Sequence, residues 1–285
     1  MRRAKAFTMI ELLTVIAIVS ILVGISLPNL SRSREEAKRT VCAANERGIG
    51  QAFYLYAMEA PDPGHFPSIG PLVDAGSNNA HMFYSADRTS EPSTTGAPSP
   101  TVDLWAVVRR DYSVPKQFIC PSTTDIPDPV ADTTVYFDFA SIKNLSYGYQ
   151  FQHSQNRTII GMSSEPTFPV LADGNPYIKG GVSAGVSLPS DRTGSGRGNS
   201  TNHSDREGQN VLYQDTHVEF ERGPDVGLPG KVQSVPRSRG RDNCYSYFVS
   251  IYDPVDPGVM KPEWVASVGT ATVALGGKSD ACLVP

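Results

Sequence analysis

An uncharged apolar run lies near the start of the chain, at residues 12–27, directly after Glu11. Counted back to Met9, the run would form a helix of about 25–30 Å, close to the thickness of a bilayer's hydrocarbon core. The flank before it is basic, with Arg2, Arg3 and Lys5. Because basic flanks stay on the cytoplasmic side, we expect a single pass through the cytoplasmic membrane. Residues 26–29 make a poor cleavage site for an ordinary secretory signal.

Glu11 is the one acidic residue at the start of this apolar segment, and it has two interpretations. A carboxylate inside lipid is costly unless it has a partner, so Glu11 could serve a function that supplies one. Alternatively, it could simply lie at the level of the lipid headgroups.

From Asn29 the chain becomes polar but keeps a helical period. Apolar or small residues recur every three, four or seven positions, at Leu30, Ala37, Val41, Ala44, Gly48, Ala52 and Leu55. Asp62-Pro63-Gly64 then ends the helical pattern. We therefore predict that the helix continues outside the membrane over residues 29–60 and packs through this stripe on the chain's own head.

The remaining residues, 61–285, predict a loop-rich head with an antiparallel sheet. One short helix is expected at residues 101–111. Alternation and apolar runs predict strands at residues 117–120, 146–151, 168–172, 209–213, 216–220 and 245–252. Segments rich in Ser, Thr, Pro, Gly or Arg predict mobile loops near 89–100, 180–200 and 222–241. The expected fold class is α+β, with a long N-terminal helix packed on this sheet.

The composition agrees with abundant loops, since the 285 residues include 25 Gly and 23 Pro. The net charge of −4 gives no basic surface for phosphate, so nucleic acid is not an expected partner. The sequence contains no Walker A, Gly-x-Ser-x-Gly or His-Glu-x-x-His motif. We therefore expect no enzyme activity.

Candidate metal ligands stand at Asp173, His203, Asp215 and His217. Carboxylates and imidazoles bind Ca²⁺ or transition metals, although this spacing matches no known ligand motif. The alternative is that the aspartates are turn residues that bond their own backbone. No cofactor is expected, apart from a structural Ca²⁺ ion as an open alternative.

The four cysteines, Cys42, Cys120, Cys244 and Cys282, form no Cys-x-x-Cys pair. Outside the cytoplasm, disulfides persist. The preferred pairing is Cys42 with Cys120, joining the helix to the sheet, and Cys244 with Cys282. Reduced, buried cysteines are the alternative.

Residues 5–15, KAFTMIELLTV, resemble the signal of type IV pilins and type II secretion pseudopilins. The resemblance implies that a prepilin peptidase cuts between Ala6 and Phe7, leaving residues 1–6 as a leader and a transmembrane helix at 7–28. It also implies N-methylation of Phe7, a kink at Pro28, and pairing of Glu11 with the N-terminal amine of a neighbouring subunit. The family usually has Gly where this chain has Ala6.

Residues 42–52, CAANERGIGQA, and 208–218, GQNVLYQDTHV, resemble pseudopilin-like proteins of planctomycetes with an "H-X9-DG" domain. Two departures are visible. Thr216 stands where the family usually has Gly. Eleven residues separate His203 from Asp215, whereas the family pattern has nine. The last 65 residues match nothing that we can name.

These resemblances imply a structural subunit of a type II secretion pseudopilus or a type IV pilus-like filament, with its head periplasmic or extracellular. Its partners would be other pilin-like subunits, prepilin peptidase, an inner-membrane assembly platform and membrane lipid. The alternative is a membrane-anchored module that binds polysaccharide or another polymer. Such a module could stack sugars on aromatics exposed on the head; the candidates are Tyr147, Tyr149, Tyr245 and Tyr247, of which half should face the core.

Overall fold

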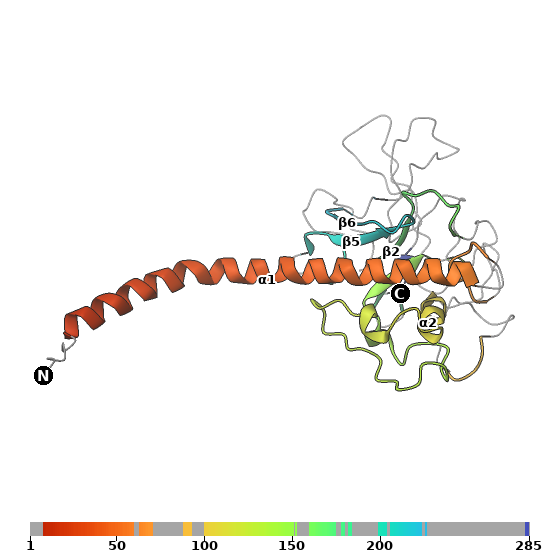
Figure 1. Cartoon of the computed structure of the whole chain (residues 1–285), viewed down its shortest axis with the longest axis horizontal. Coiled ribbons are helices and arrows are strands. Elements are labelled where there is room, and N and C mark those ends of the chain that lie inside the picture. The colour runs from red at the N-terminus through yellow and green to blue at the C-terminus, as the bar shows by residue number, and fades with distance from the viewer. Residues whose placement is uncertain are drawn as a thin grey trace, which may run out of the picture.

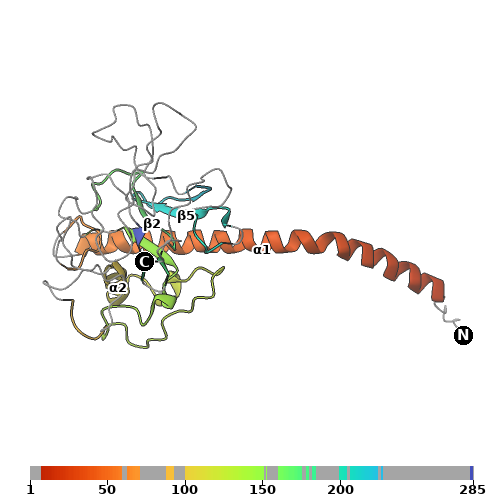
Figure 2. The same ribbon diagram turned by 180° about the vertical axis from the view of Figure 1, so that it is seen from behind.

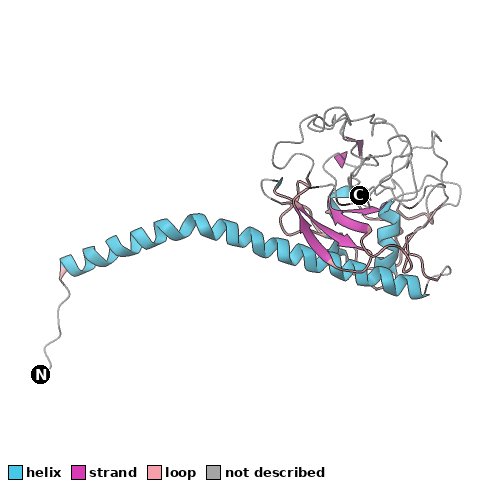
Figure 3. Cartoon of the chain, turned by 90° about the horizontal axis from the view of Figure 1, so that it is seen from above, coloured by secondary structure: helices cyan, strands magenta, loops and turns pink. Residues whose placement is uncertain are grey.

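The computed structural model describes residues 8–59, 63–70, 88–92, 100–150, 152, 160–174, 178–179, 182–183, 199–203, 206–223, 226 and 283–284. Its dominant element is α1, a single helix of 51 residues at Met9–Glu59. Figure 1 shows the first half of α1 projecting from the head, and Figure 2 shows the same from behind. The backbone remains helical across Pro28 and the ribbon curves gently (Figure 3). A discrete kink at Pro28 stays a prediction.

The projecting half contains the apolar run. Met9–Ser26 is the one helical segment, among the residues that the structure describes, that is long and apolar enough to cross a membrane. None of this segment is buried against the head. Its side chains therefore need an apolar environment from outside the chain.

The second half of α1 packs on the head, but through a different face from the predicted stripe. Cys42, Ile49 and Phe53 are fully buried, whereas Val41 and Leu55 are about half exposed. Of the predicted stripe, Ala52 is buried, but Ala37 and Ala44 are exposed. The prediction of this face was wrong because the buried face includes polar residues, which weaken its hydrophobic signal. The apolar stripe lies to the side and remains accessible.

The sheet has five antiparallel strands in the order β6-β5-β2-β1-β7. The strands are β1 at Tyr147–Gln150, β2 at Pro169–Asp173, β5 at Gln209–Tyr213, β6 at Val218–Glu221 and β7 at Leu283–Val284. A separate hairpin joins β3 at Ile178–Lys179 to β4 at Val182–Ser183. α1 contacts β5 and β6 on one side of its axis and α2, at Pro100–Arg109, on the other (Figure 1).

The core lies between α1, the sheet and α2, which spans Pro100–Arg109. Phe53 of α1 packs on Tyr149 of β1, with ring centroids 5.0 Å apart. Trp105 of α2 meets Phe139 edge to face at 4.9 Å, and its indole N–H donates to the carbonyl of Tyr136. Each large ring thus buries apolar area while its polar atoms stay bonded.

The helix expected at 101–111 is confirmed as α2, and the strands expected at 146–151, 168–172, 209–213 and 216–220 are confirmed as β1, β2, β5 and β6, with shifted ends. The strand expected at 117–120 is wrong, because the 3₁₀ helix η1 occupies Pro115–Phe118. Pro115 suits the first turn of a helix, and the Gln117 side chain accepts from the backbone N–H of Val114. A second 3₁₀ turn, η2, spans Ile142–Asn144.

The α+β, pilin-like fold expected from the sequence is the fold observed, with a long apolar N-terminal helix and a small antiparallel sheet. The strand expected at 245–252 lies outside the described residues, as does most of the three loops expected near 89–100, 180–200 and 222–241. The domain bounds inferred from the sequence stay predictions.

Candidate functional site

The N-terminal turn of α1 is closed by Thr8 and Glu11. The Glu11 carboxylate accepts hydrogen bonds from the Thr8 backbone N–H at 2.8 Å and from the Thr8 hydroxyl at 2.7 Å. The Thr8 hydroxyl in turn accepts from the Glu11 N–H at 3.3 Å. This is a capping box, which satisfies helix N–H groups that would otherwise lack partners. Ala6 and Phe7, the expected cleavage and methylation residues, lie outside the described residues, and so their roles and that of Glu11 stay predictions.

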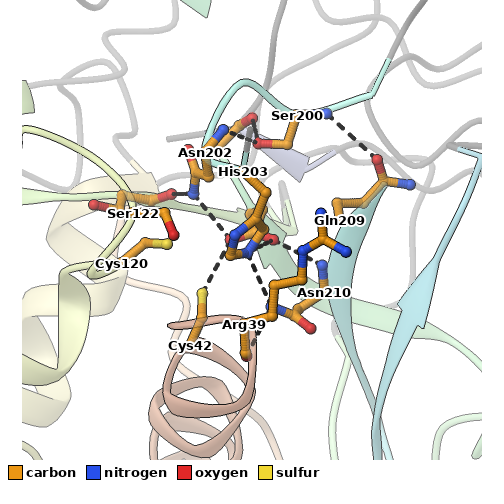
Figure 4. Close-up of polar contacts among 12 residues, drawn as sticks. Arg39, Cys42, Cys120, Ser122, Ser200, Asn202, His203, Gln209 and Asn210 are labelled. Carbon is orange, nitrogen blue, oxygen red and sulfur yellow. Dashed lines mark hydrogen bonds and ion pairs between the residues drawn. The ribbon is translucent and has the colours of Figure 1, made fainter. Parts of the chain in front are cut away.

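A second constellation of reactive side chains is buried where α1 meets the sheet (Figure 4). It consists of Cys42, Cys120, Asp173 and His203, and we call it the buried cluster. One donor atom from each residue lies within 4.8 Å of the other three, and all four residues are buried. They come from α1, from the segment after η1, from the end of β2 and from residues 199–203. Four distant parts of the chain therefore converge on one point.

Asp173 is the hub of the buried cluster. Its carboxylate accepts from the Asn210 backbone N–H at 2.7 Å and from the Asn202 side-chain amide at 2.9 Å. The Cys42 thiol donates to it at 3.2 Å. Asn202 also donates to the Ser146 carbonyl at 2.6 Å, which ties residues 199–203 to the start of β1. These bonds fix the Asp173 carboxylate in one orientation.

His203 bridges two carboxylates. Its Nε2 lies 3.2 Å from Asp173 Oδ2, and its Nδ1 lies 2.9 Å from Glu35 Oε1 on α1. Ser122 donates to the same Glu35 oxygen at 2.8 Å. Burial lowers the pKa of His203, but the hydrogen bond and charge of Asp173, with help from Cys120 and Glu35, raise that pKa to about 9. The imidazole is therefore protonated at neutral pH, where it balances the carboxylates.

The two thiols of the buried cluster differ in acidity. Burial raises the pKa of the Cys42 thiol well above its usual value. Interaction with the neighbouring Cys42 side chain lowers the pKa of Cys120. Both are free thiols in the structure, so the Cys42–Cys120 disulfide stays a prediction, although the two residues are neighbours as that pairing requires. Cys244 and Cys282 lie outside the described residues.

Sequence reasoning missed Glu46, one helical turn after Cys42. Its side chain is fully buried, and neither carboxylate oxygen has a hydrogen-bond partner. Burial, then the charges of Asp173 and Cys120, raise its pKa. The i,i+4 spacing from Cys42 is the signal that could have placed it beside the buried cluster.

The expected set of metal ligands does not form one site. Asp173 and His203 meet, but Asp215 and His217 lie in the turn between β5 and β6. Asp173 bonds to Asn210 at the start of β5, whereas Asp215 follows the end of that strand. Asp215 accepts from the His217 backbone N–H at 3.1 Å and also contacts its ring, as a turn residue does.

Two of the four tyrosines proposed for the alternative binding module face the core. Tyr147 and Tyr149 are both fully buried in the core. The Tyr149 hydroxyl donates to the Pro67 carbonyl at 2.9 Å, which holds this ring inside the head. Tyr245 and Tyr247 lie outside the described residues. Tyr147 and Tyr149 therefore cannot stack on a sugar at the surface.

The apolar N-terminal helix and the small antiparallel sheet are consistent with a type IV pilin-like fold. Residues 1–27 match the family model "Prokaryotic N-terminal methylation motif". Together with the span at Met9–Ser26, this motif indicates anchoring in a membrane.

Two relatives are pilins of Thermus thermophilus. The chain is 54% identical over 44 residues to the "Type IV wide pilus major component PilA4", covering 15% of this chain and 34% of the relative. It is 27% identical over 107 residues to the "Type IV narrow pilus major component PilA5", covering 38% of this chain and 89% of the relative. The match to PilA4 thus spans about a third of that protein's length. No solved structure matches the chain significantly.

Proposed function

We propose that this protein is a structural subunit of a pilin-like or pseudopilin-like filament that assembles through α1. The observation that carries the proposal is the apolar surface that α1 leaves uncovered. In the membrane half this surface surrounds the helix. In the head half it continues as the stripe formed by Leu30, Ala37, Val41, Ala44 and Leu55, which we call the outer stripe.

The outer stripe is suited to packing against α1 of other subunits. Leu30, Val41 and Leu55 are between 46% and 52% exposed, although the head-facing side of the same helix is fully buried. Burying an aliphatic side chain completely stabilises an assembly by about 1.5–3 kcal/mol relative to full exposure, so each half-exposed residue could contribute part of that amount. The small residues Ala37 and Ala44 would allow close approach of a second helix.

Glu11 would change partners on assembly. In the single chain its carboxylate caps the first turn through Thr8. After cleavage before Phe7, the new N-terminal amine of one subunit could pair with Glu11 of the next. Losing one side of a buried ion pair costs about 3–5 kcal/mol, which makes this carboxylate a sensitive test of assembly.

The finer assignment is a pseudopilin of a type II secretion system, in preference to a surface pilin. No adhesin-type disulfide loop is recognisable in the tail of the sequence, which is the reason for this preference. The role is structural and not catalytic. Other pilin-like subunits, a prepilin peptidase, the inner-membrane assembly platform and membrane lipid would be its partners. The head would be periplasmic or extracellular.

Two adjacent positions on α1 provide a matched test. Val41 lies in the outer stripe, whereas Thr40 is exposed about 100° away around the helix, at the edge of the stripe. Val41→Glu and Thr40→Glu add the same charge to the same turn. We expect both variants to reach the membrane fraction, and Val41→Glu alone to lose intersubunit crosslinking in native cells. Equal crosslinking in the two variants would refute assembly through this stripe.

Glu11→Ala tests the other end of the helix. The substitution makes the span more apolar, so membrane insertion should be unchanged. Intersubunit crosslinking should fall, because the neighbouring amine loses its carboxylate. Crosslinking equal to that of the wild type would favour the membrane-anchored binding module instead.

A further inference from the structure

We propose that Cys42, Cys120, Asp173 and His203 bind one zinc ion, which fastens α1 to the head. This site lies outside the assembly surfaces described above. Thiolate, imidazole and carboxylate are the side chains that coordinate zinc, and structural zinc sites have four protein ligands. The buried cluster supplies one donor from each of four residues, two of them sulfur.

The spacing of the donors suits a tetrahedral ion. With Zn–S distances of about 2.3 Å and Zn–N or Zn–O distances of about 2.0–2.1 Å, neighbouring ligand atoms lie about 3.3–3.8 Å apart. His203 Nε2 lies 3.2 Å from Asp173 Oδ2, whereas Cys42 Sγ lies 3.2 Å from the other carboxylate oxygen, Asp173 Oδ1. With one donor atom taken from each residue, all separations in the buried cluster are within 4.8 Å. Small side-chain movements would therefore complete the coordination.

The residues around the buried cluster orient it as the outer shell of a metal site does. Glu35 contacts Nδ1 of His203, which leaves Nε2 directed at the other donors. A ligating histidine almost always donates its second ring N–H to a carboxylate or carbonyl in this way. Asp173 is likewise held by Asn202 and the Asn210 backbone. Figure 4 shows Cys42 approaching from the helix and Asn202 and His203 from the opposite side.

Charge also favours a cation at this position. Glu46 contributes a fully buried carboxyl group whose oxygens have no hydrogen-bond partner. Asp173 adds a second buried carboxylate, which the His203 imidazolium balances in the metal-free protein. A zinc ion would offset these groups, and its binding would release the protons of the two thiols and of His203 to solvent. The sulfur ligands select zinc over Ca²⁺, which prefers oxygen.

A disulfide between Cys42 and Cys120 excludes this zinc site, because oxidised sulfur cannot serve as thiolate. The disulfide needs the two sulfur atoms bonded to each other, whereas the zinc site needs both as thiolates. The two states can be distinguished by measuring metal and thiols in the same sample.

The test uses the full-length protein, solubilised in detergent from native membranes without reducing agent or chelator. Metal is counted by inductively coupled plasma mass spectrometry. We expect about one zinc ion per chain, as for a four-ligand structural site. Cys120→Ser should lose it. His217→Gln is the matched control, since it alters the other His–Asp pair, outside the buried cluster, and should retain the metal.

Cobalt replacement provides a readout that does not depend on any variant folding. Co²⁺ added to zinc-depleted wild-type protein should give a thiolate-to-cobalt charge-transfer band. Glu35→Gln keeps all four ligands and should weaken zinc binding about 10–100-fold in competition with a chelating dye. Equal zinc content in Cys120→Ser and wild type, absence of the cobalt band, or a Cys42–Cys120 disulfide with no zinc would each overturn the proposal.

Discussion

Thr216 occupies a backbone conformation that suits glycine, and replacing it should stabilise the head. Its φ is +72°, in the left-handed region. A residue with a Cβ atom costs about 1–2 kcal/mol there. Glycine removes that strain but makes the unfolded chain more flexible, which costs about 0.5–1 kcal/mol. The difference predicts that Thr216→Gly raises the free energy of unfolding by about 0.5–1 kcal/mol.

The contacts of this turn should survive the substitution. The Thr216 backbone N–H donates to the Tyr213 carbonyl at 3.0 Å, and the Tyr213 N–H donates to the His217 carbonyl at 3.0 Å. Both bonds involve backbone atoms alone. The gain in stability from Thr216→Gly would therefore come from relief of backbone strain, since both hydrogen bonds are kept.

The assay is equilibrium urea unfolding of the full chain in detergent micelles, followed by tryptophan fluorescence, since Trp105 is buried in the core. Thr216→Ala is the control, because alanine keeps the Cβ atom and should leave most of the strain in place. A Thr216→Gly midpoint equal to or below that of the wild type would refute the strain argument. So would an equal gain from Thr216→Ala.

Three further predictions concern other parts of the chain. The folded pKa of Glu46 is raised above the unfolded value, so stability should fall by about 1.4 kcal/mol per pH unit above about pH 4.3 while the folded group stays protonated. In zinc-free protein, Glu46→Gln should remove this pH dependence of stability. An equal change of stability with pH in the wild type and in Glu46→Gln would contradict the prediction. Gly161→Ala would place a Cβ atom 1.9 Å from the Gly64 carbonyl oxygen and should lower the free energy of unfolding by about 1–3 kcal/mol. Gly223→Ala is the control and should be nearly neutral, because nothing lies within 4 Å of its Cβ position. Equal urea midpoints for the two variants would contradict the prediction. Mass spectrometry of the mature protein should find N-methyl-Phe7 at its start, and an intact leader in the mature pool would refute processing.

The elements predicted best were those with strong local signals. The uncharged run at residues 12–27 was enough to predict the projecting half of α1. Alternation located the strand near β1, and a hairpin pattern around Gln214-Asp215 located β5 and β6. The strand expected at 117–120 failed because Pro115 and Gln117 close a 3₁₀ turn locally.

The face of α1 could not be read from hydrophobicity alone. The head buries Cys42 and Glu46 together with Ile49 and Phe53, so the buried side is less apolar than a simple stripe. The more regular apolar pattern belongs to the outer stripe. A single sequence does not distinguish a face buried within the chain from one reserved for a neighbouring chain.

The sequence placed Asp173 and His203 among the candidate ligands but could not group them correctly. Their meeting with Cys42 and Cys120 depends on contacts distant in sequence, such as the bond from the Asn210 backbone to Asp173. Asp215 and His217 have the same residue types but belong to a local turn. Residue type alone therefore predicted ligand chemistry, and only the arrangement of the strands and of residues 199–203 decided which residues share a site.

The filament proposal is tested most directly by electron microscopy of material sheared from native cells, with gold-labelled antibody against the head. We expect filaments labelled repeatedly along their length when the wild-type protein is overproduced. Such filaments should disappear in the Val41→Glu strain and persist in the Thr40→Glu strain. Protein found only in the membrane fraction, with no labelled filament in any strain even when the protein is overproduced, would contradict the claim that this chain is a filament subunit.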